Sequence, residues 1–187
     1  MFDFFYNKMT KNTPCEFEMG MSDTDSFLFR VTKPDLFWKH VNQWMDFSNY
    51  PTDHTKFNNN NKAKLGFFKD ELCGNQICKG FIGLRPKCYA LKLKSKDTLT
   101  SSEKKVCKGL GRVAIKNRLR YSEYQQCLTN RKIIRHHYAS IRSQKHNLKT
   151  IVQHKKALTY FDAKRYLFSC GIHSAPYGSE LILLFQD

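Results

Sequence analysis

Two carboxylates stand one residue apart in the stretch GMSDTDSFLF, residues 20–29. Asp23 and Asp25 carry like charges, which repel each other unless a cation lies between them. At a tight turn both carboxylates can converge on one hard cation, and Mg²⁺ binds through one or two carboxylates together with substrate phosphates. That combination is typical of phosphoryl and nucleotidyl transfer. The spacing therefore predicts a site for Mg²⁺, or for Mn²⁺ in its place, with Asp23 and Asp25 as its metal-binding and catalytic residues.

An Asp-x-Asp pair also occurs where no nucleotide is transferred. Asp and Ser suit solvent-exposed turns, where two acids can simply be hydrated. Two further enzyme classes use the pattern, namely sugar-nucleotide transferases and phosphatases with an aspartate nucleophile. Those phosphatases require Thr or Val two residues after the second Asp, where this chain has Phe27. The phosphatase interpretation is therefore disfavoured, and the others stay open.

The elements around the pair are predicted from their patterns. Residues 15–22 alternate between polar and apolar types, and residues 26–31 are apolar and aromatic, so both read as strands with DTDS at the tip of a β-hairpin. Pro34 suits the first turn of a helix. Over residues 34–47 the apolar side chains recur near helical spacing, which predicts an amphipathic helix.

The rest of the chain reads as continuous and mixed. Residues 57–64, FNNNNKAK, are predicted to form a loop, and residues 74–94 one or two strands broken near Gly83 and Pro86. Ser122 and Gln125 have the spacing of a capping box that opens a short helix. Residues 138–143 and 148–154 read as two basic strands. We therefore expect an α+β fold, with a β-hairpin and flanking helices followed by a basic, mixed region.

The charge of the chain points to a polyanionic partner. Its 32 Lys and Arg outnumber 16 Asp and Glu, for a net charge of +16, and nucleic acid is the leading explanation of such an excess. A membrane is not expected, because we find no basic amphipathic helix and no apolar run near the roughly 20 residues of a spanning helix. The first residues do not resemble a secretory signal, so we expect a protein that stays inside the cell.

Cysteine and histidine spacing predicts no structural metal site. The seven cysteines are odd in number and lack a close C-x-x-C pair, so we expect reduced thiols. A zinc cluster is a rival interpretation, but its spacings match no common zinc finger, and neighbouring residues of a strand point to opposite faces. The residues that it would use are His136, His137, His146, His154, Cys127 and Cys170.

Four segments in order resemble one protein family. SDTDSFLF, residues 22–29, resembles the third palm motif of family B DNA polymerases, which is usually Tyr-x-Asp-Thr-Asp-Ser followed by an apolar strand. Residues 65–91 are similar to the stretch that leads into the Lys-x-Tyr motif of protein-primed members from Maverick or Polinton transposons and related viruses, with Lys87 and Tyr89 in that motif. Residues 104–110, KKVCKGL, resemble the Lys-Gly step that follows. Residues 141–167 resemble the end of the polymerase region, with its Lys-Arg-Tyr near an Asp.

The resemblance implies a role for each matching residue. Asp25 would ligate the catalytic magnesium ions, and Asp23 would support the metal site and the triphosphate. Lys87 and Tyr89 would hold the primer strand, a role that suits them physically, because an ammonium group pairs with a backbone phosphate and a tyrosine stacks or bonds beside it without reading sequence. An ordinary half-exposed strand pair is the alternative for these two. Further phosphate contacts are expected from Arg85, Lys108, Lys92 and Lys94.

The resemblance also implies an incomplete enzyme. Residues 1–95 would be the C-terminal part of the palm and residues 96–187 a thumb-like region with a tail. The partners would be primer-template DNA, deoxynucleoside triphosphates and an N-terminal part of the polymerase that carries the first two palm motifs. Met21 replaces the family's usual Tyr. We therefore expect part of a DNA-directed DNA polymerase that is inactive alone, or else a non-catalytic, basic nucleic-acid-binding module derived from one.

Overall fold

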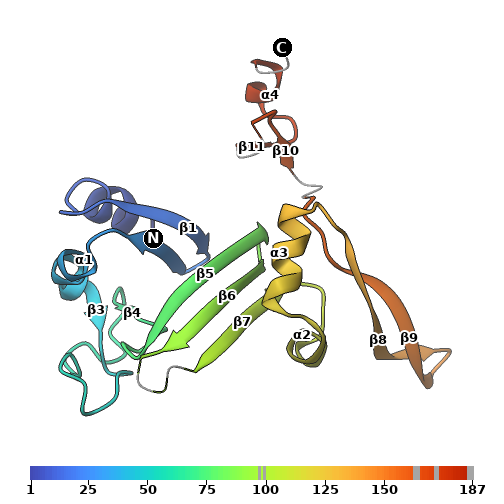
Figure 1. Ribbon diagram of the computed structural model, residues 1–187, viewed down its shortest axis with the longest axis horizontal. Coiled ribbons are helices and arrows are strands. Elements are labelled where there is room, and N and C mark those ends of the chain that lie inside the picture. The colour runs from blue at the N-terminus through green and yellow to red at the C-terminus, as the bar shows by residue number, and fades with distance from the viewer. Residues whose placement is uncertain (97, 99, 162–164, 171–172, 185–187) are drawn as a thin grey trace. The chain divides into compact units, whose positions relative to one another are not determined.

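The computed structural model describes residues 1–187 except 97, 99, 162–164, 171–172 and 185–187 (Figure 1). The described residues contain both helices and strands, and the strands form several small sheets. The predicted α+β class is therefore confirmed. The chain divides into two compact units, one of residues 1–81 with 92–102 and one of residues 82–91 with 103–187. The assignment of residues 1–95 to a palm and 96–187 to a thumb stays a prediction.

The first unit contains the predicted β-hairpin and helical segments. β1 and β2 pair antiparallel, and β3 and β4 form a short parallel pair. The helix that begins at Pro34 is confirmed but ends earlier than expected, and its last predicted residues form a 3₁₀ turn and a strand. The elements are η1 (Phe4–Met9, a π-helix), β1 (Phe17–Asp23), β2 (Ser26–Val31), α1 (Pro34–Val41), η2 (Asn42–Trp44), β3 (Met45–Asp46) and β4 (Phe68–Lys69).

Aromatic side chains attach one face of the hairpin to the core of this unit. The ring of Phe29 lies 5.4 Å from that of Phe17 and 5.2 Å from that of Phe27, measured between centroids. Phe17 and Phe29 pack against the buried residues Met9, Val41, Met45, Phe47 and Tyr50. Burial of this apolar surface fixes the face that the hairpin turns toward the core, because a slip of one residue would exchange its two faces.

The loop over residues 57–64 lies outside the helices and strands, as predicted, and a buried carboxylate anchors it. Asp46 accepts hydrogen bonds from the N–H groups of Ser48 at 2.9 Å and Ala63 at 3.0 Å. The ammonium of Lys69 lies 3.4 Å from the same side chain. Burial raises the pKa of Asp46, but the hydrogen bonds, those from Ser48 foremost, outweigh it and lower the pKa to about 2.

A three-stranded sheet follows, in the order β5 (Gln76–Arg85), β6 (Cys88–Ser95), β7 (Ser101–Cys107). The strands predicted over residues 74–94 are confirmed as two, with the break at Pro86 and Lys87, while Gly83 lies inside β5. Lys87 adopts a φ of 58°, in the left-handed region. The third strand, β7, was not predicted. Each of the three strands has some residues in the first compact unit and the others in the second.

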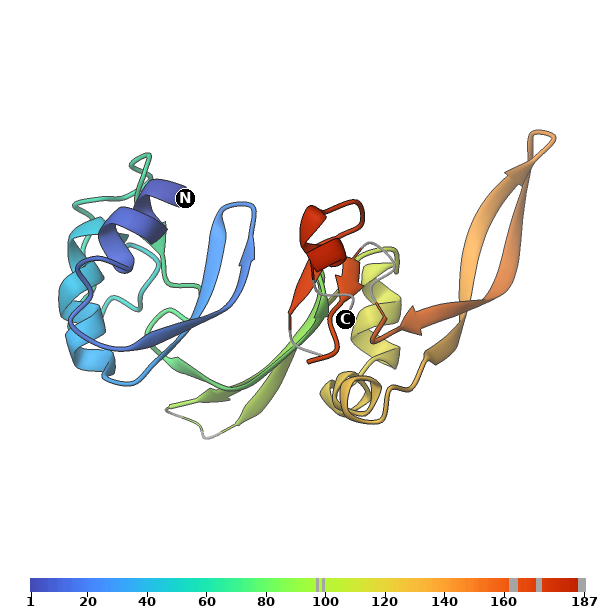
Figure 2. The same ribbon diagram turned by 90° about the horizontal axis from the view of Figure 1, so that it is seen from above.

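The second unit combines helices with a long β-hairpin. α2 (Arg112–Arg118) and α3 (Tyr121–Thr129) precede β8 (Ile134–Gln144) and β9 (Asn147–Leu158), and β10 (Arg165–Leu167), β11 (Ser174–Pro176) and α4 (Glu180–Leu184) follow. Figures 1 and 2 show β8 and β9 as a two-stranded ribbon. The strands pair from Ile134 opposite Leu158 to Gln144 opposite Asn147. The two basic strands predicted here are therefore confirmed, and both are longer than predicted.

A buried cluster joins the sheet, the helices and the base of the hairpin within this unit. Tyr124, Leu119 and Leu158 are almost wholly buried there beside the thiols of Cys88 and Cys127. The hydroxyl of Tyr124 donates a hydrogen bond to the carbonyl oxygen of Val106 at 3.0 Å. This bond satisfies a polar group that would otherwise be costly to bury.

The predicted capping box is wrong in its residues. α3 begins at Tyr121, so Ser122 lies inside the helix and Arg120 is the N-cap residue. The side chain of Glu123 accepts the N–H of Arg120 at 2.9 Å, which is the bond that Gln125 was expected to make. The helix itself is confirmed. Within the part of the chain that the structure describes, no helix has the length and hydropathy needed to cross a membrane.

Candidate functional site

The DTDS segment forms a two-residue hairpin turn. Asp23 at the end of β1 pairs with Ser26 at the start of β2, which leaves Thr24 and Asp25 in the turn. The N–H of Asp25 donates to the carbonyl oxygen of Asp23 at 2.7 Å, and the hydroxyl of Ser26 donates to the same oxygen at 3.1 Å. Both carboxylates therefore lie at the tip of the hairpin, as predicted from the sequence.

Thr24 holds an unusual backbone conformation in this turn. Its φ is +57°, in the left-handed region that β-branched residues rarely adopt. The hydroxyl of Thr24 donates a hydrogen bond to a carboxylate oxygen of Asp23 at 3.1 Å. A left-handed residue other than glycine costs on the order of 1–2 kcal/mol, and such strain is concentrated at functional sites. A two-residue hairpin turn requires a positive φ at a central residue, and six other non-glycine residues among those described share this conformation. Thr24 differs from these six in its β-branched side chain and in its position between two aspartates.

A β-bulge determines which face of the hairpin Asp23 occupies. The register shifts between Met19 and Met21, so that Met19 pairs with Phe29 and Met21 pairs with Leu28. Cross-strand partners share a face. Asp23 consequently shares its face with Met21, and both lie opposite the face on which the phenylalanines pack into the core. Gly20 occupies the bulge, where an added Cβ would lie 3.4 Å from the ring of Phe81.

The tip of the hairpin supplies two carboxylates, those of Asp23 and Asp25. Asp25 is exposed in the turn and Asp23 is half-buried. In the described ranges, no group of three or more His, Cys, Asp and Glu side chains is placed to hold a metal ion. Two carboxylates match the protein share of an Mg²⁺ site that is completed by water and substrate phosphates. Whether a metal binds here stays a prediction.

The predicted primer-binding residues gather in the second unit, around the turn between β5 and β6. The N–H of Lys108 donates to the carbonyl oxygen of Lys87 at 2.9 Å, so these two backbone segments lie side by side. Both lysine side chains are exposed. Tyr89 is half-buried and lies between the buried Cys88 and Ala90, from which strand alternation turns it to the opposite face.

Arg85 occupies a different environment from these lysines. Its side chain is half-buried, and its buried Nε has no hydrogen-bond partner among the described residues. The guanidinium group is close enough to Cys88 to contribute to a lowered pKa of that thiol. A role for Arg85 in primer binding stays a prediction. Of the two other lysines expected to contact phosphate, Lys92 is exposed and Lys94 is half-buried.

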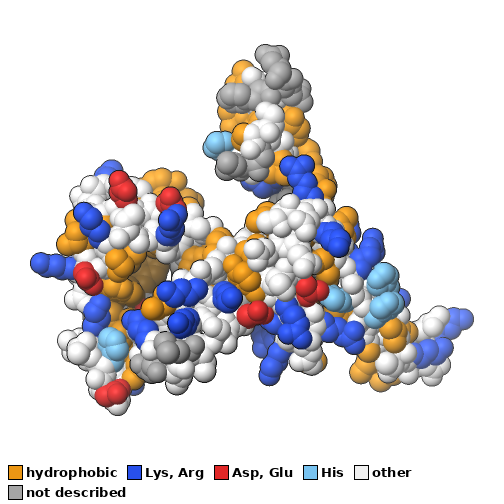
Figure 3. Space-filling model, in the orientation of Figure 1, with side chains coloured by type: hydrophobic (Ala, Val, Ile, Leu, Met, Phe, Trp, Pro, Cys, Tyr) orange, Lys and Arg blue, Asp and Glu red, His pale blue; other side chains and the backbone are white. Residues whose placement is uncertain are grey.

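The β8–β9 hairpin presents cations that the site prediction did not include. Arg142 pairs with Lys149, and Arg135 pairs with Lys156, so like charges stand opposite each other across the ribbon. All four side chains are exposed, and the sequence has no acidic residue between Glu123 and Asp162. Directly opposed like charges destabilise a hairpin unless an anion neutralises them. Figure 3 shows Lys and Arg side chains at the end of this ribbon.

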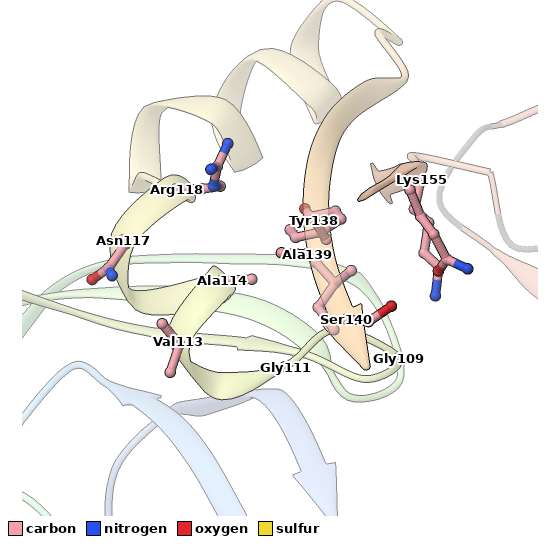
Figure 4. Close-up of a pocket in the computed structure, with 12 residues that line it drawn as sticks. Gly109, Gly111, Val113, Ala114, Asn117, Arg118, Tyr138, Ala139, Ser140 and Lys155 are labelled. Carbon is pink, nitrogen blue, oxygen red and sulfur yellow. The ribbon is translucent and has the colours of Figure 1, made fainter. Parts of the chain in front are cut away.

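A cavity of about 400 Å³ lies between the hairpin and α2, within the second unit (Figure 4). The turn at Gly109 and Gly111 and the side of α2 form one wall, and Tyr138 and Ser140 of β8 form another. Its lining residues include the cations Arg118 and Lys155 and no carboxylate, so the cavity continues the basic character of the hairpin. The hydroxyl of Tyr138 is buried and has no hydrogen-bond partner within the described part of the chain.

The histidines and cysteines of the rival zinc interpretation are dispersed. His136 is 3.0 Å from the carboxylate of Glu123, whereas the ring of its neighbour His137 stacks on that of His154, with centroids 4.5 Å apart. Adjacent histidines thus point to opposite faces, as expected. Cys127 is buried in the core, and Cys170 contacts His173 instead. Of the segment that resembles the end of the polymerase region, Asp162 and Lys164 lie outside the described residues.

The sequence predicts the position of the hairpin tip but not the arrangement of the basic β8–β9 ribbon. The signal that could have found it was the spacing of basic residues about a centre at residues 145–146, which places Arg142 opposite Lys149. Comparison of the chain with protein-family models, with curated proteins and with solved structures gives no significant match.

Proposed function

We propose that this chain is part of a DNA-directed DNA polymerase of family B, similar to the protein-primed enzymes of Maverick or Polinton transposons and related viruses. The observation that carries the proposal is the DTDS turn, where two carboxylates flank a strained Thr24 at the tip of a hairpin. Strain of this kind persists where the surrounding fold maintains it, and it is found at catalytic and ligand-binding positions. Two adjacent carboxylates at such a tip suit Mg²⁺-dependent nucleotidyl transfer.

Under this proposal the two aspartates have different roles at the metal site. Asp25, which is exposed in the turn, ligates the magnesium ions, and Asp23 supports the metal site and the triphosphate of the incoming nucleotide. A two-metal site needs ligands on both sides of the ions. Since the described residues offer no third ligand at the tip, another part of the polymerase completes the site. The chain alone therefore incorporates no nucleotide with Mg²⁺ or Mn²⁺, and primer extension by the purified chain would contradict this architecture.

Under the same proposal the primer strand is bound by Lys87, Tyr89 and Lys108. The exposed ammonium groups of the two lysines neutralise backbone phosphates, and Tyr89 lies beside them without reading bases. The hydrogen bond between the Lys108 and Lys87 backbones supports this grouping, because it keeps the two lysine-bearing segments together. Lys87→Ala is expected to weaken primer-template binding, with no effect on metal binding at the hairpin tip.

Metal binding at the tip can be tested on the chain itself. We expect Mn²⁺, added with a deoxynucleoside triphosphate, to broaden the NMR amide signals of residues 22–26 first, because a paramagnetic ion relaxes the nearest nuclei most strongly. Asp25→Asn keeps the size of the side chain and removes its charge, so the selective broadening should disappear. Asp53→Asn, a change at an exposed aspartate in another loop of the same unit, is the matched control and should leave the broadening intact.

Two results would overturn the metal assignment. One is Mn²⁺ broadening spread evenly over all exposed acidic residues of the chain. The other is selective broadening at residues 22–26 that persists unchanged in Asp25→Asn.

A second candidate function rests on a separate observation, the ribbon without acidic residues. Opposed cations on β8 and β9 favour a non-catalytic, basic nucleic-acid-binding module derived from a polymerase. Such a module binds single-stranded and primer-template DNA with little sequence preference, and it does so equally well with Asp23→Asn and Asp25→Asn. Retained DNA binding combined with no selective Mn²⁺ effect would favour this second function over the first.

A further inference from the structure

Two thiols face each other in the core of the second unit. The sulfur atoms of Cys88, on β6, and Cys107, on β7, are 3.8 Å apart. The two residues are 0% and 2% exposed. All seven cysteines of the chain are free thiols in the structure. The Cys88–Cys107 pair is thus a dithiol held in contact by the fold, and the proposed polymerase function makes no use of it.

The surroundings make the two thiols chemically unequal. Cys107 Sγ lies 3.2 Å from the carbonyl oxygen of Ala157, which is an alternative acceptor to the Cys88 sulfur for its one S–H proton. The hydrogen bond with Cys107 lowers the pKa of Cys88 against the opposing effect of burial, and the guanidinium of Arg85 contributes in the same direction. The same hydrogen bond, together with burial, raises the pKa of Cys107. Cys88 is consequently the thiol that ionises first, with Arg85 beside it as a counter-ion.

We propose that Cys88 and Cys107 form an oxidation site, at which a hydroperoxide converts the neighbouring thiols into a disulfide within the folded second unit. The contact between the sulfurs makes the reaction intramolecular. Closing the bond requires the sulfurs to approach from 3.8 Å to the roughly 2 Å of a disulfide.

The reaction balances with the hydroperoxide as the oxidant. The Cys88 thiolate attacks one peroxide oxygen, the O–O bond breaks, and the departing oxygen takes a proton, leaving a sulfenic acid on Cys88. The Cys107 sulfur then attacks the sulfenic sulfur. The S–S bond forms as the S–O bond breaks, and the hydroxide leaves as water with the proton of Cys107. Two thiols lose two electrons and two protons, and one molecule of hydrogen peroxide becomes two of water.

The position of the pair gives the oxidation a structural effect. Cys88 stands between Lys87 and Tyr89, and Cys107 immediately precedes Lys108. A disulfide would join the first residue of β6 to the last residue of β7, beside the backbone hydrogen bond between Lys108 and Lys87. It would cross-link the two segments that carry these lysines. The oxidation site itself does not depend on the proposed polymerase function.

Cys127 provides a matched comparison. It is also fully buried in the same cluster, and burial raises its pKa to about 11. No hydrogen bond from Cys127 to another cysteine is found in the described residues. If contact between the sulfurs decides the reaction, Cys127 stays a thiol under conditions that oxidise the pair. If the core admits oxidant without selection, Cys127 is consumed with the others.

The test uses dilute full-length chain treated with hydrogen peroxide, a small oxidant suited to buried thiols. Remaining thiols are alkylated after unfolding, and the digested peptides are identified by mass. We expect a cross-linked peptide that joins Cys88 to Cys107, lighter by two hydrogen atoms than the two free peptides, with Cys127 alkylated. Alkylation of both Cys88 and Cys107, while exposed thiols such as Cys170 are oxidised, would overturn the proposal. So would random pairing that includes Cys127.

A variant separates the two steps. In Cys107→Ser the second thiol is missing, so the oxidised Cys88 should persist as a sulfenic acid that dimedone traps, and the cross-link should be lost. Cys127→Ser should retain the Cys88–Cys107 cross-link. If Cys107→Ser does not fold, the peptide map of the unaltered chain still decides the question, because it needs no substitution.

Discussion

Removing the opposed cations of the β8–β9 ribbon should weaken DNA binding by an amount that the salt dependence reveals. The variant replaces Arg135, Arg142, Lys149 and Lys156 by Gln. These form two directly paired sets on adjacent strands, and all four are exposed. Gln keeps most of the length and polarity of each side chain, so the change removes charge and leaves the backbone pairing of the ribbon intact.

The magnitude follows from counterion release. Each phosphate contact with duplex DNA contributes about 0.9 to the slope of log K against log salt concentration. If each of the four cations meets one phosphate, the slope should fall by about 3.6. Affinity at roughly 0.1 M salt should then fall about 10³- to 10⁴-fold from this effect alone. The loss should be somewhat larger than this, because binding to the variant no longer relieves like-charge repulsion between paired residues of the ribbon.

Fluorescence anisotropy of a labelled primer-template duplex, titrated at several salt concentrations, measures the slope. The matched control replaces four exposed lysines of the first unit, Lys11, Lys33, Lys39 and Lys62, by Gln. Both variants lose four positive charges, so a response to net charge alone would be the same in each. The reasoning is refuted if the ribbon variant and the control variant reduce the slope equally, or if the ribbon variant leaves it unchanged.

Two further predictions concern the fold that supports the hairpin. Gly74→Ala should lower the free energy of unfolding by about 2–4 kcal/mol, because φ is +72° and an added Cβ would lie 2.7 Å from the Tyr50 ring; roughly 1 kcal/mol comes from backbone strain and about 1–3 kcal/mol from overpacking. The control is Gly66→Ala, at φ +83° in open space, which should cost only the strain. Equal costs of the two variants in urea unfolding would contradict the packing around Gly74. The pKa of Asp46 is lowered from 3.8 to about 2, so the stabilisation by its carboxylate is complete above the ordinary pKa and is lost as the pH falls through the lowered pKa. Asp46→Asn should therefore flatten the decline of stability between about pH 4 and 2. An unchanged acid-unfolding profile would show that the carboxylate does not contribute.

The hairpin tip could be predicted from sequence because local rules determine it. Alternation on one side, an aromatic run on the other and Asp-Thr-Asp-Ser between them identify two strands and a turn without any distant contact. The bulge at Gly20 was not predictable in this way. Its surroundings come from distant parts of the chain, because the ring of Phe27 lies 6.2 Å from that of Phe68 and a Cβ added at Gly20 would lie 3.4 Å from the ring of Phe81.

Elements that depend on distant contacts were missed or misassigned. β7 reads SSEKKVC, which is mostly polar, and it becomes a strand because it pairs with β6. The N-cap of α3 is Arg120 and not Ser122, and the N–H of Tyr121, the first residue of the helix, donates to the carboxylate of Glu103 at 3.0 Å, 18 positions away. The contact between Cys88 and Cys107 has no sequence signature at all, since these cysteines are nineteen positions apart and become neighbours only through strand pairing.

The exposure of the β8–β9 ribbon has a consequence for its order. Every residue from Ile141 to Thr150 is exposed, and Ile141, Leu148 and Val152 are 76%, 77% and 70% exposed on one face. A two-stranded sheet with no covering layer is only marginally stable in water. The distal half should therefore exchange its amide hydrogens faster than the base near Leu158, where the core begins. Any partner that binds the tip must first make the ribbon rigid, so part of the binding free energy is used to order the protein.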